Sequence, residues 1–424
     1  MIYGIRDIPK TGKEWVLYAL QQVLAVFVAT VLIATICGTP ISSCLFGACV
    51  GTLLYQCITG FRSPMFISSC GATCSAVIGA LAIGETGQNY LAVAIGGFIV
   101  FLIYAIFAVI SRVWGIIAIN QIFPPAVVGA VTIVIGLNLA TFIPTYVSVN
   151  GEHNDIGIII AVATMTVVAL TSHYFKGFMK TIPFLLGLLF GYALSAIATL
   201  TGICNLIDFS QFKNMSIISV PDFTFLKWDF NEVSWGVIGQ VCLLFIPVAI
   251  CAMLEHYSDH KVLSNIIGVD LTLNPGLHKT LLGDGAASWL GTMVCGLPNT
   301  SYGESIATTG FSKVASVYVI TLAAGILGLM SFITPIQVFL QTIPACVFGG
   351  CAMILYGYIA ASGLRTIVNS KIDLSDNRNL IIISVILTVG VSGLFWFHES
   401  FTGVALAMVL GVFLNLILKK KKVE

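Results

Sequence analysis

The sequence predicts an all-α polytopic membrane protein, and its composition and one long uncharged stretch are the first evidence. Only 9% of the 424 residues are charged, 58% are hydrophobic, and the mean hydropathy is +1.01. Soluble domains are usually about 25% charged. Residues 15–61 contain no charged side chain, which is enough for two crossings of about 20 residues each. This composition excludes an ordinary soluble enzyme, a disordered chain and a nucleic-acid-binding protein, because the last needs a basic surface.

Apolar stretches separated by charged residues, Pro or Gly predict fourteen membrane-spanning segments. The stretch that begins at Trp15 is too long for the apolar region of a cleaved signal peptide, so we interpret it as the first segment. The third and tenth segments are poor helices, because Pro64–Ser75 is rich in Ser, Cys and Gly and Pro298–Gly310 is rich in polar residues. The expected segments are 15–37, 41–60, 64–83, 89–111, 124–144, 156–174, 181–202, 235–256, 276–296, 299–312, 314–333, 338–360, 380–397 and 401–418.

The positions of Lys and Arg support this number of segments and predict the orientation. With the N-terminus in the cytoplasm, seventeen of the nineteen Lys and Arg residues fall on the cytoplasmic side, as the positive-inside rule expects. The two exceptions, Lys213 and Lys227, lie in the long loop 203–234. We therefore expect a multi-pass protein of the inner (plasma) membrane with both termini cytoplasmic. The basic tail Lys419–Lys422 is interpreted as an anchor for this topology, with binding of anionic lipids as a second interpretation.

A weak internal repeat indicates a transporter. Pro125-Ala-Val-Val-Gly129 opens the fifth segment, and the similar Pro344-Ala-Cys-Val-Phe-Gly349 opens a stretch in the twelfth. The helix-poor third segment likewise matches the helix-poor tenth. Both pairs lie seven segments apart, and because seven is odd the second copy must enter the membrane inverted. Inverted repeats with interrupted segments at matching positions are typical of secondary transporters, whose site lies near the midplane.

Three carboxyl groups stand out as candidates within or beside predicted segments, where an ionisable group costs about 2.5–3.5 kcal/mol. Glu255 and Asp259 are four residues apart and hence share one helical face. Glu304 lies in the interrupted tenth segment, where non-helical backbone requires a cavity lined by protein or filled with water. Two alternatives are open at this point. Glu255 could reach outward from the end of its segment, and Asp259 could lie at the membrane interface because His260 and Lys261 follow it.

Such a cavity suits a neutral ring that alternates N–H and C=O groups, such as a pyrimidine-dione or an oxopurine. Carboxylates accept hydrogen bonds, and backbone amides near Gly303, Glu304 and Gly71 can donate them. An anionic substrate would be repelled, and neither interrupted segment contains Lys or Arg. Because burial disfavours the charged form of a carboxyl group, one of these acids could also bind and release a proton in each cycle.

Four stretches occur in a recognisable order: Glu255-His-Tyr-Ser-Asp-His-Lys-Val-Leu-Ser264, Asn274-Pro-Gly-Leu-His278, Gly283-Asp-Gly285 and Pro298-Asn-Thr-Ser-Tyr-Gly-Glu304. In these stretches the chain resembles the nucleobase–ascorbate transporter family, also called nucleobase/cation symporters, and within it the bacterial uracil permeases. Ala19–Val31 also resembles the first segment of those proteins.

The resemblance implies a seven-plus-seven inverted repeat with a core domain and a gate domain. Short β-strands would cross in segments 3 and 10, and the substrate would lie between these strands and segment 8. It also implies uptake of a nucleobase by proton symport, with uracil as the first candidate and xanthine or another oxopurine as the second. The implied divisions are core 1–112 and 235–333, gate 113–202 and 334–424, and extracytoplasmic loop 203–234.

The resemblance also implies roles for single residues. The implied substrate-binding residues are Glu255, Glu304, Gly303, Gly71, Gln22 and Tyr302, and the implied proton-coupling residues are Glu255, Asp259 and Glu304. Two departures concern this site. Gln22 stands where the family usually has a histidine, and Ser305-Ile-Ala307 stands where it usually has Asn-x-Gly. The amide of Gln22 can form hydrogen bonds, but it cannot bind a proton at physiological pH.

Other functions fit the sequence less well. An anion transporter of similar architecture would carry a cationic or neutral residue in place of Glu304. A membrane-embedded enzyme would need a nucleophile with its base or a set of metal ligands, and only His256 and His260 have suitable spacing. We therefore expect no enzymatic activity, no cofactor and no metal. The predicted partners are the substrate, protons and the lipid bilayer, with a possible homodimer through the gate domain.

Overall fold

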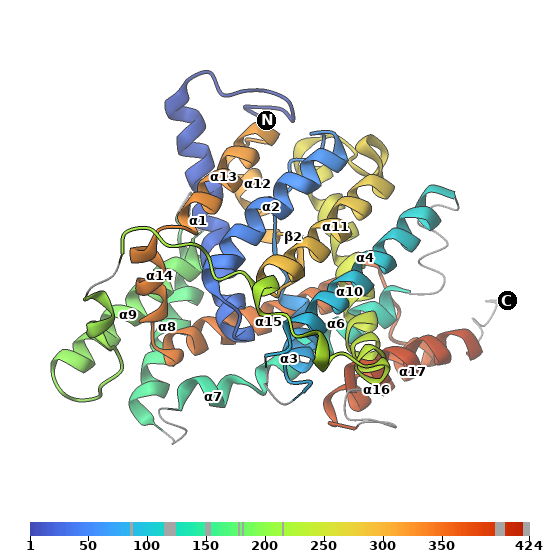
Figure 1. Cartoon of the computed structure of the whole chain (residues 1–424). Helices are drawn as coiled ribbons and strands as arrows, with labels where there is room; N and C mark the ends of the chain where they lie inside the picture. The colour runs from blue at the N-terminus through green and yellow to red at the C-terminus, as the bar shows by residue number, and fades with distance from the viewer. Residues whose placement is uncertain are drawn as a thin grey trace.

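The computed structural model is a helical protein with two short strands at its centre (Figure 1). It describes residues 1–84, 88–113, 124–148, 154–176, 179, 182–213, 216–394 and 403–418. Lys180 and the basic tail Lys419–Lys422, which entered the prediction of orientation, lie outside the described residues.

The elements of the first half and of the long loop are α1 Gly12–Cys37, α2 Ile41–Thr59, β1 Ile67–Ser69, η1 Gly71–Thr73, α3 Cys74–Leu81, α4 Tyr90–Val113, α6 Pro125–Ala140, α7 Ile143–Val147, α8 Asp155–Tyr174, α9 Pro183–Leu200, η3 Phe209–Phe212, η4 Thr224–Lys227 and η5 Phe230–Glu232. Those of the second half are α10 Trp235–Ile267, η6 Thr272–Gly276, α11 Leu277–Cys295, β2 Asn299–Ser301, α12 Gly303–Ser312, α13 Val317–Met330, α14 Thr334–Gln341, α15 Ala345–Asn369, α16 Asn377–Val391 and α17 Gly403–Ile417.

Local sequence signals start and stop these helices. The side chain of Thr11 accepts a hydrogen bond from the amide of Glu14 and caps the start of α1. Gly38, with a φ of 68°, ends that helix in the left-handed conformation that glycine adopts without strain. The repeated Pro motifs have a common role, because Pro125 occupies the first turn of α6 and Pro344 caps α15.

The two interrupted segments meet at the centre of the molecule, as the sequence analysis expected. β1 and β2 pair antiparallel, with Ser68 opposite Thr300. Each strand leads directly into a short helix, η1 with α3 on one side and α12 on the other. The strand backbone gains further partners from side chains, since Thr52 Oγ1 accepts from the amide of Ile67 at 3.0 Å. Irregular backbone at membrane depth needs such partners because lipid offers none.

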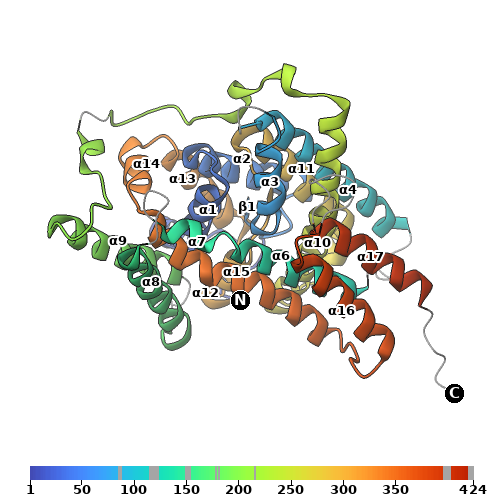
Figure 2. The same cartoon turned by 90° about the horizontal axis from the view of Figure 1, so that it is seen from below.

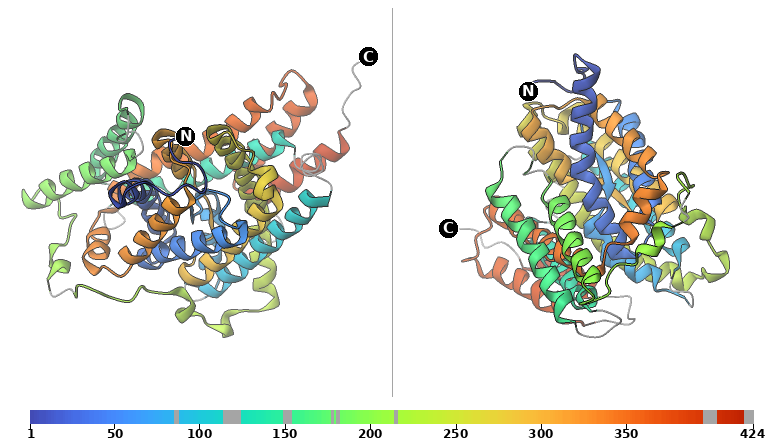
Figure 3. Two further views of the ribbon diagram at one scale, coloured as in Figure 1. Left: turned by 90° about the horizontal axis from the view of Figure 1, so that it is seen from above. Right: turned by 90° about the vertical axis from the view of Figure 1, so that its left-hand side faces the viewer.

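The helices form two groups that correspond to a core and a gate. In the first group α11 packs against α2 and α4, and α1 packs against α13, which stands beside it in Figure 3. In the second group α15 packs against α6 and α8, and α16 packs against α17. Figure 2 shows α6 and α15 between the α8–α9 pair and the α16–α17 pair. The loop between α9 and α10 runs along the outside of the molecule from the second group to the first (Figures 2 and 3).

Two segment boundaries differ from the prediction. Segment 8 was expected to end at residue 256, but α10 continues to Ile267 and contains 33 residues, about 50 Å of helix. Segment 12 was expected over 338–360, but α14 is a separate helix, Pro344 starts a new one, and α15 continues to Asn369. In both α10 and α15 the hydropathy falls before the helix ends, because polar residues such as Asp259 and Arg365 occupy the turns that follow the apolar stretch.

Close packing of α6 on α15 predicts a strong effect of a small substitution. A Cβ atom on Gly363 would lie 2.4 Å from the carbonyl oxygen of Gly129 and 2.7 Å from the amide nitrogen of Ile133. Gly363→Ala should therefore destabilise the protein by about 1–3 kcal/mol, as overpacking usually does, and lower its unfolding temperature in detergent. Gly357→Ala on the same helix is the matched control, because nothing lies within 4 Å of its Cβ position. Equal unfolding temperatures for the two variants would contradict this packing.

Candidate substrate-binding site

A cavity of about 300 Å³ lies beside the crossed strands and is called the central cavity. This volume is at the lower end of the range for small-molecule sites, about 300–1,000 Å³. Its walls come from β1, η1, β2 and α12 of the core, from α1 and α10, and from α15 of the gate. The lining residues are Ile33, Ser69, Cys70, Gly71, Ala72, Glu255, Thr300, Ser301, Tyr302, Gly303, Glu304, Ala307, Leu355, Tyr358, Ile359 and Ser362.

The structure brings most of the predicted binding residues together in this cavity. Glu255 from α10 and Glu304 from α12 both line it. Gly303 and Glu304 are the first residues of α12, and Gly71 is the first residue of η1. The first amides of a helix have no acceptor within the helix, so both short helices direct hydrogen-bond donors towards the cavity. Glu255 lines the cavity from within the long helix α10. The alternative in which it reaches outward from the end of a segment is therefore wrong.

Asp259 lies close to β2 rather than at an exposed interface. Its Oδ2 accepts a hydrogen bond of 3.0 Å from Ser301 Oγ, which comes from a residue that lines the central cavity. Its neighbour His260 is fully buried, with Nε2 2.7 Å from the hydroxyl oxygen of Tyr55. Of residues 259–261, only Lys261 fits the interpretation as part of the interface. Its Nζ lies 3.9 Å from Oδ2 of Asp270, which follows the end of α10.

Two predicted residues occupy different positions relative to the cavity. Tyr302 lines it and is 5% exposed. Gln22 is buried and is not among the lining residues. Its Nε2 donates to Thr309 Oγ1 at 3.2 Å and to the carbonyl of Ser305 at 3.5 Å. The structure therefore places Gln22 behind α12, where it holds the short helix that carries Glu304.

A buried carboxyl group that the sequence analysis left without a role anchors β2. Asp284 of α11 is 0% exposed, and its Oδ2 accepts from Thr300 Oγ1 at 2.9 Å and from the amide of Ser301 at 3.4 Å. The same oxygen contacts Nδ1 of the fully buried His256. His256 therefore packs into the core beside α11. The signal for Asp284 was an acidic residue inside a predicted segment, which is costly in a membrane.

A buried hydroxyl group was also missed. The Ser69 side chain lines the central cavity and is fully buried. Within the part of the chain that the structure describes, its Oγ has no hydrogen-bond partner. Buried polar groups are nearly always satisfied, so this hydroxyl is an exception among the buried groups beside the cavity. No local pattern distinguishes Ser69, since it is one of several small polar residues in its segment.

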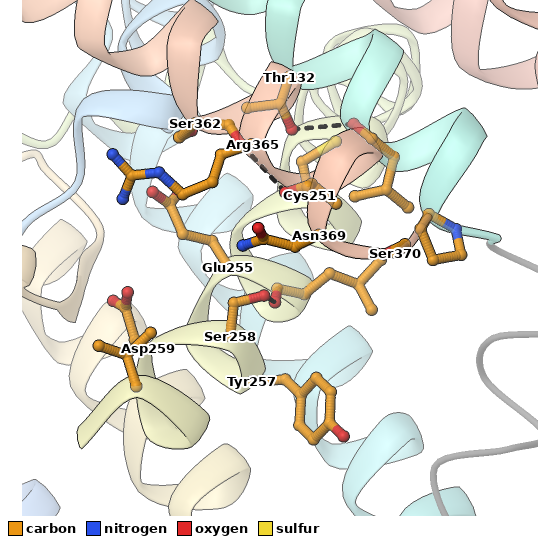
Figure 4. Close-up of a pocket in the computed structure, with 15 residues that line it drawn as sticks. Thr132, Cys251, Glu255, Tyr257, Ser258, Asp259, Ser362, Arg365, Asn369 and Ser370 are labelled. Atoms are coloured by element: carbon orange, nitrogen blue, oxygen red, sulfur yellow. Dashed lines mark hydrogen bonds between the residues drawn. The ribbon is translucent and has the colours of Figure 1, made fainter. Parts of the chain in front are cut away.

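A second cavity of about 270 Å³ lies next to the central cavity and shares Glu255 and Ser362 with it (Figure 4). We call it the vestibule. It lies between residues 251–262 of α10, the last turns of α15 and the first turns of α6. Figure 4 shows Glu255 and Asp259 on α10, and Arg365 and Asn369 on α15, among the residues around it. Arg365 was expected only as one of the cytoplasmic cations.

The chain is similar to a family model described as "Permease family", which matches residues 13–399. It is 36% identical to the uracil permease of Bacillus subtilis (strain 168), over 99% of this chain and 96% of that protein. It is 34% identical to the uracil permease of Escherichia coli (strain K12), over 95% of this chain and 90% of that protein.

Solved structures show the same fold. The transmembrane domain of the cyanobacterial bicarbonate transporter BicA matches with a TM-score of 0.67 and 13% identity, over 97% of this chain and 99% of that chain. SLC26A9 matches with a TM-score of 0.66 and 12% identity, over 96% of this chain and 66% of that chain. The predicted fold class, a seven-plus-seven inverted repeat with core and gate, is confirmed. The relatives are permeases, so the protein is a transporter rather than an enzyme, and the chain belongs to the nucleobase–ascorbate transporter family.

Proposed function

We propose that the protein imports a nucleobase, most simply uracil, by proton symport with alternating access between core and gate. The names of the relatives, uracil permeases from Bacillus subtilis and Escherichia coli, support this substrate. The distribution of Lys and Arg in the sequence supports a location in the inner membrane with cytoplasmic termini. A homodimer through the gate half is a further prediction from the family.

One observation carries the proposed substrate: acceptors and donors line a single central cavity. Glu255 and Glu304 present carboxylate oxygens, and the first amides of α12 and η1, at Gly303 and Gly71, are positioned to donate. A pyrimidine-dione has ring N–H groups that can donate to the carboxylates and carbonyl oxygens that can accept from the amides. Leu355, Tyr358 and Ile359 of α15 supply apolar surface for the faces of a flat ring.

The charges of the central cavity favour a neutral substrate over an anion. The starts of helices carry partial positive charge and by themselves attract anions. Here Glu304 lies in the first turn of α12 and adds a negative charge at that point. Among the described residues that line the central cavity there is no Lys or Arg. The likeness to anion transporters therefore concerns the fold, while the side chains support a different substrate.

An oxopurine such as xanthine is the second candidate. A Cβ atom on Gly71 would meet only Ile359 Cδ1 at 3.4 Å and Ile33 Cδ1 at 3.8 Å. These are van der Waals contacts, so Ile359 and Ile33 bound the cavity on the Gly71 side, and a second ring there would require these side chains to move.

Proton coupling is supported by the placement of the acids. Glu255 lines both cavities, and Asp259 is joined through Ser301 to the strand beside the substrate. Carboxyl groups in such positions are the usual proton carriers of transporters. A proton that binds to Glu255 would therefore change the same group that binds the base.

Uptake into proteoliposomes tests this function. With an inward proton gradient, labelled uracil should accumulate, and dissipating the gradient with a protonophore should stop accumulation. Excess unlabelled uracil should compete, and bicarbonate should not. Stronger competition by xanthine than by uracil would favour the second candidate. Uptake of bicarbonate with no response to any base would contradict the proposal.

A further inference from the structure

The vestibule is bounded by matching polar faces of a core helix and a gate helix. On α10 the lining residues recur at helical spacing and include Cys251, Glu255, Ser258, Asp259 and Val262. On α15 they are Ser362, Arg365, Thr366 and Asn369, again one face of the helix. The acids of this pair of faces lie on the core side and the cation lies on the gate side.

Arg365 and Glu255 both lack partners in this arrangement. Within the described residues, neither side chain makes a hydrogen bond or an ion pair. Both are exposed to the cavity space rather than packed. Asp259, in contrast, already accepts from Ser301 Oγ. Among the described residues that line the vestibule, Arg365 is the only Lys or Arg. An unpaired guanidinium and an unpaired carboxyl group therefore face one cavity from opposite halves of the transporter.

We propose that Arg365 is the gate-side counter-charge of the empty transporter. When the base and the proton have left, Arg365 pairs with the ionised Glu255, and this pair permits the return of the substrate-free core. While the base and the proton are bound, Glu255 is engaged by them and Arg365 is not needed. This inference rests on the proposed proton-coupled transport.

The physical reason is the cost of an isolated charge in a membrane protein. An ionised carboxylate without a partner is strongly unfavourable away from water. The vestibule supplies water while it is open, but closing it removes that water. A bidentate guanidinium partner on the opposite wall replaces the lost hydration. Closing then brings the two groups together, because they lie on the two halves that move relative to each other.

The inference predicts a selective defect in Arg365→Gln. Exchange of labelled for unlabelled uracil uses only the loaded transporter, whereas net uptake also requires the empty transporter to return. Net uptake should fall roughly tenfold or more, since an unpaired carboxylate must then cross, while exchange should stay close to the parental rate. Arg365→Lys should keep much of the net uptake because it keeps the charge. Arg62→Gln is the matched control, because Arg62 is an exposed cation that contacts Asn274 outside both cavities.

A second background makes the test specific for the pair. In Glu255→Gln the empty site carries no charge at that position, so adding Arg365→Gln should cause little further loss of downhill net uptake. An equal fall of exchange and net uptake in Arg365→Gln, or the same loss in both backgrounds, would overturn the counter-charge role. If the parental protein neither exchanges nor accumulates uracil, the proposed function fails first and the inference falls with it.

Discussion

Replacing Glu304 by Ala should abolish detectable uracil binding. The carboxylate lies in the first turn of α12, on the wall of the central cavity and next to the donor amides of the same turn. A hydrogen bond to a charged group contributes about 1.5–3 kcal/mol, which corresponds to roughly 10- to 150-fold in Kd. The loss should exceed this for Ala, because the substitution also leaves the ring N–H of a bound base without an acceptor. Isothermal titration of the purified protein in detergent measures the effect.

Glu304→Gln separates charge from shape in the same experiment. The amide keeps the size and one acceptor, so binding should be weakened less than by Ala. Glu14→Gln is the matched control, since Glu14 accepts from the hydroxyl of Tyr3 at 2.7 Å, far from the cavity, and uracil affinity should be unchanged. Parental affinity in Glu304→Ala, with an intact elution profile, would show that uracil binds elsewhere.

Composition and spacing predicted the architecture because the membrane constrains it so strongly. Lipid permits few irregular segments, so the two stretches with too many Ser, Gly and polar residues had to be the interrupted ones. Pro125 was expected at the start of segment 5, as proline fits the first turn of a helix, whereas the matching Pro344 was expected inside segment 12 and instead starts a new helix. The same reasoning placed Glu304 at the centre, since a carboxylate in such a segment requires a cavity.

Hydropathy could not predict the features that depend on which side of a helix faces protein. α10 and α15 continue beyond their apolar stretches into turns whose polar residues line the vestibule, and a hydropathy average treats these turns as loop. Arg365 was counted as a loop cation for this reason. Gln22 was expected at the substrate, but its distance from the cavity depends on how α1 packs on α12, which no local pattern records. Asp284 has its role through contacts with residues 300 and 301, which are distant in sequence.

The starts of the short helices and the two glutamates together give the charges of the central cavity a direct interpretation. Two helix starts that point at one cavity form an arrangement that attracts negative charge. One glutamate in the first turn of α12 and another on α10 convert this arrangement into a site with both donors and acceptors. Under the proposed function, a neutral heterocycle binds at this site, and a proton on one of the acids keeps the loaded site close to neutral. The side chains at positions 255 and 304, rather than the backbone, would therefore decide the substrate class.

Glu255→Gln should retain binding but lose proton-driven accumulation. The amide keeps the length of the side chain and can still accept a hydrogen bond from the ring, but it cannot take up or release a proton. Affinity for uracil should therefore fall by about tenfold at most, the size of one weakened hydrogen bond. Exchange in proteoliposomes should persist, while the internal concentration should no longer exceed the external one when an inward proton gradient is imposed.

The matched control for this variant is Asp222→Asn, which removes a carboxylate from the exposed loop pair with Lys227 at 2.6 Å and should leave accumulation intact. The comparison with Glu304→Ala assigns the two acids different tasks. One variant should lose the substrate itself, and the other should lose only the link between substrate and proton. Accumulation at the parental level in Glu255→Gln would show that another group carries the proton. Asp259 would then be the first residue to substitute. It lies one helical turn away on the same face and contacts β2 through Ser301.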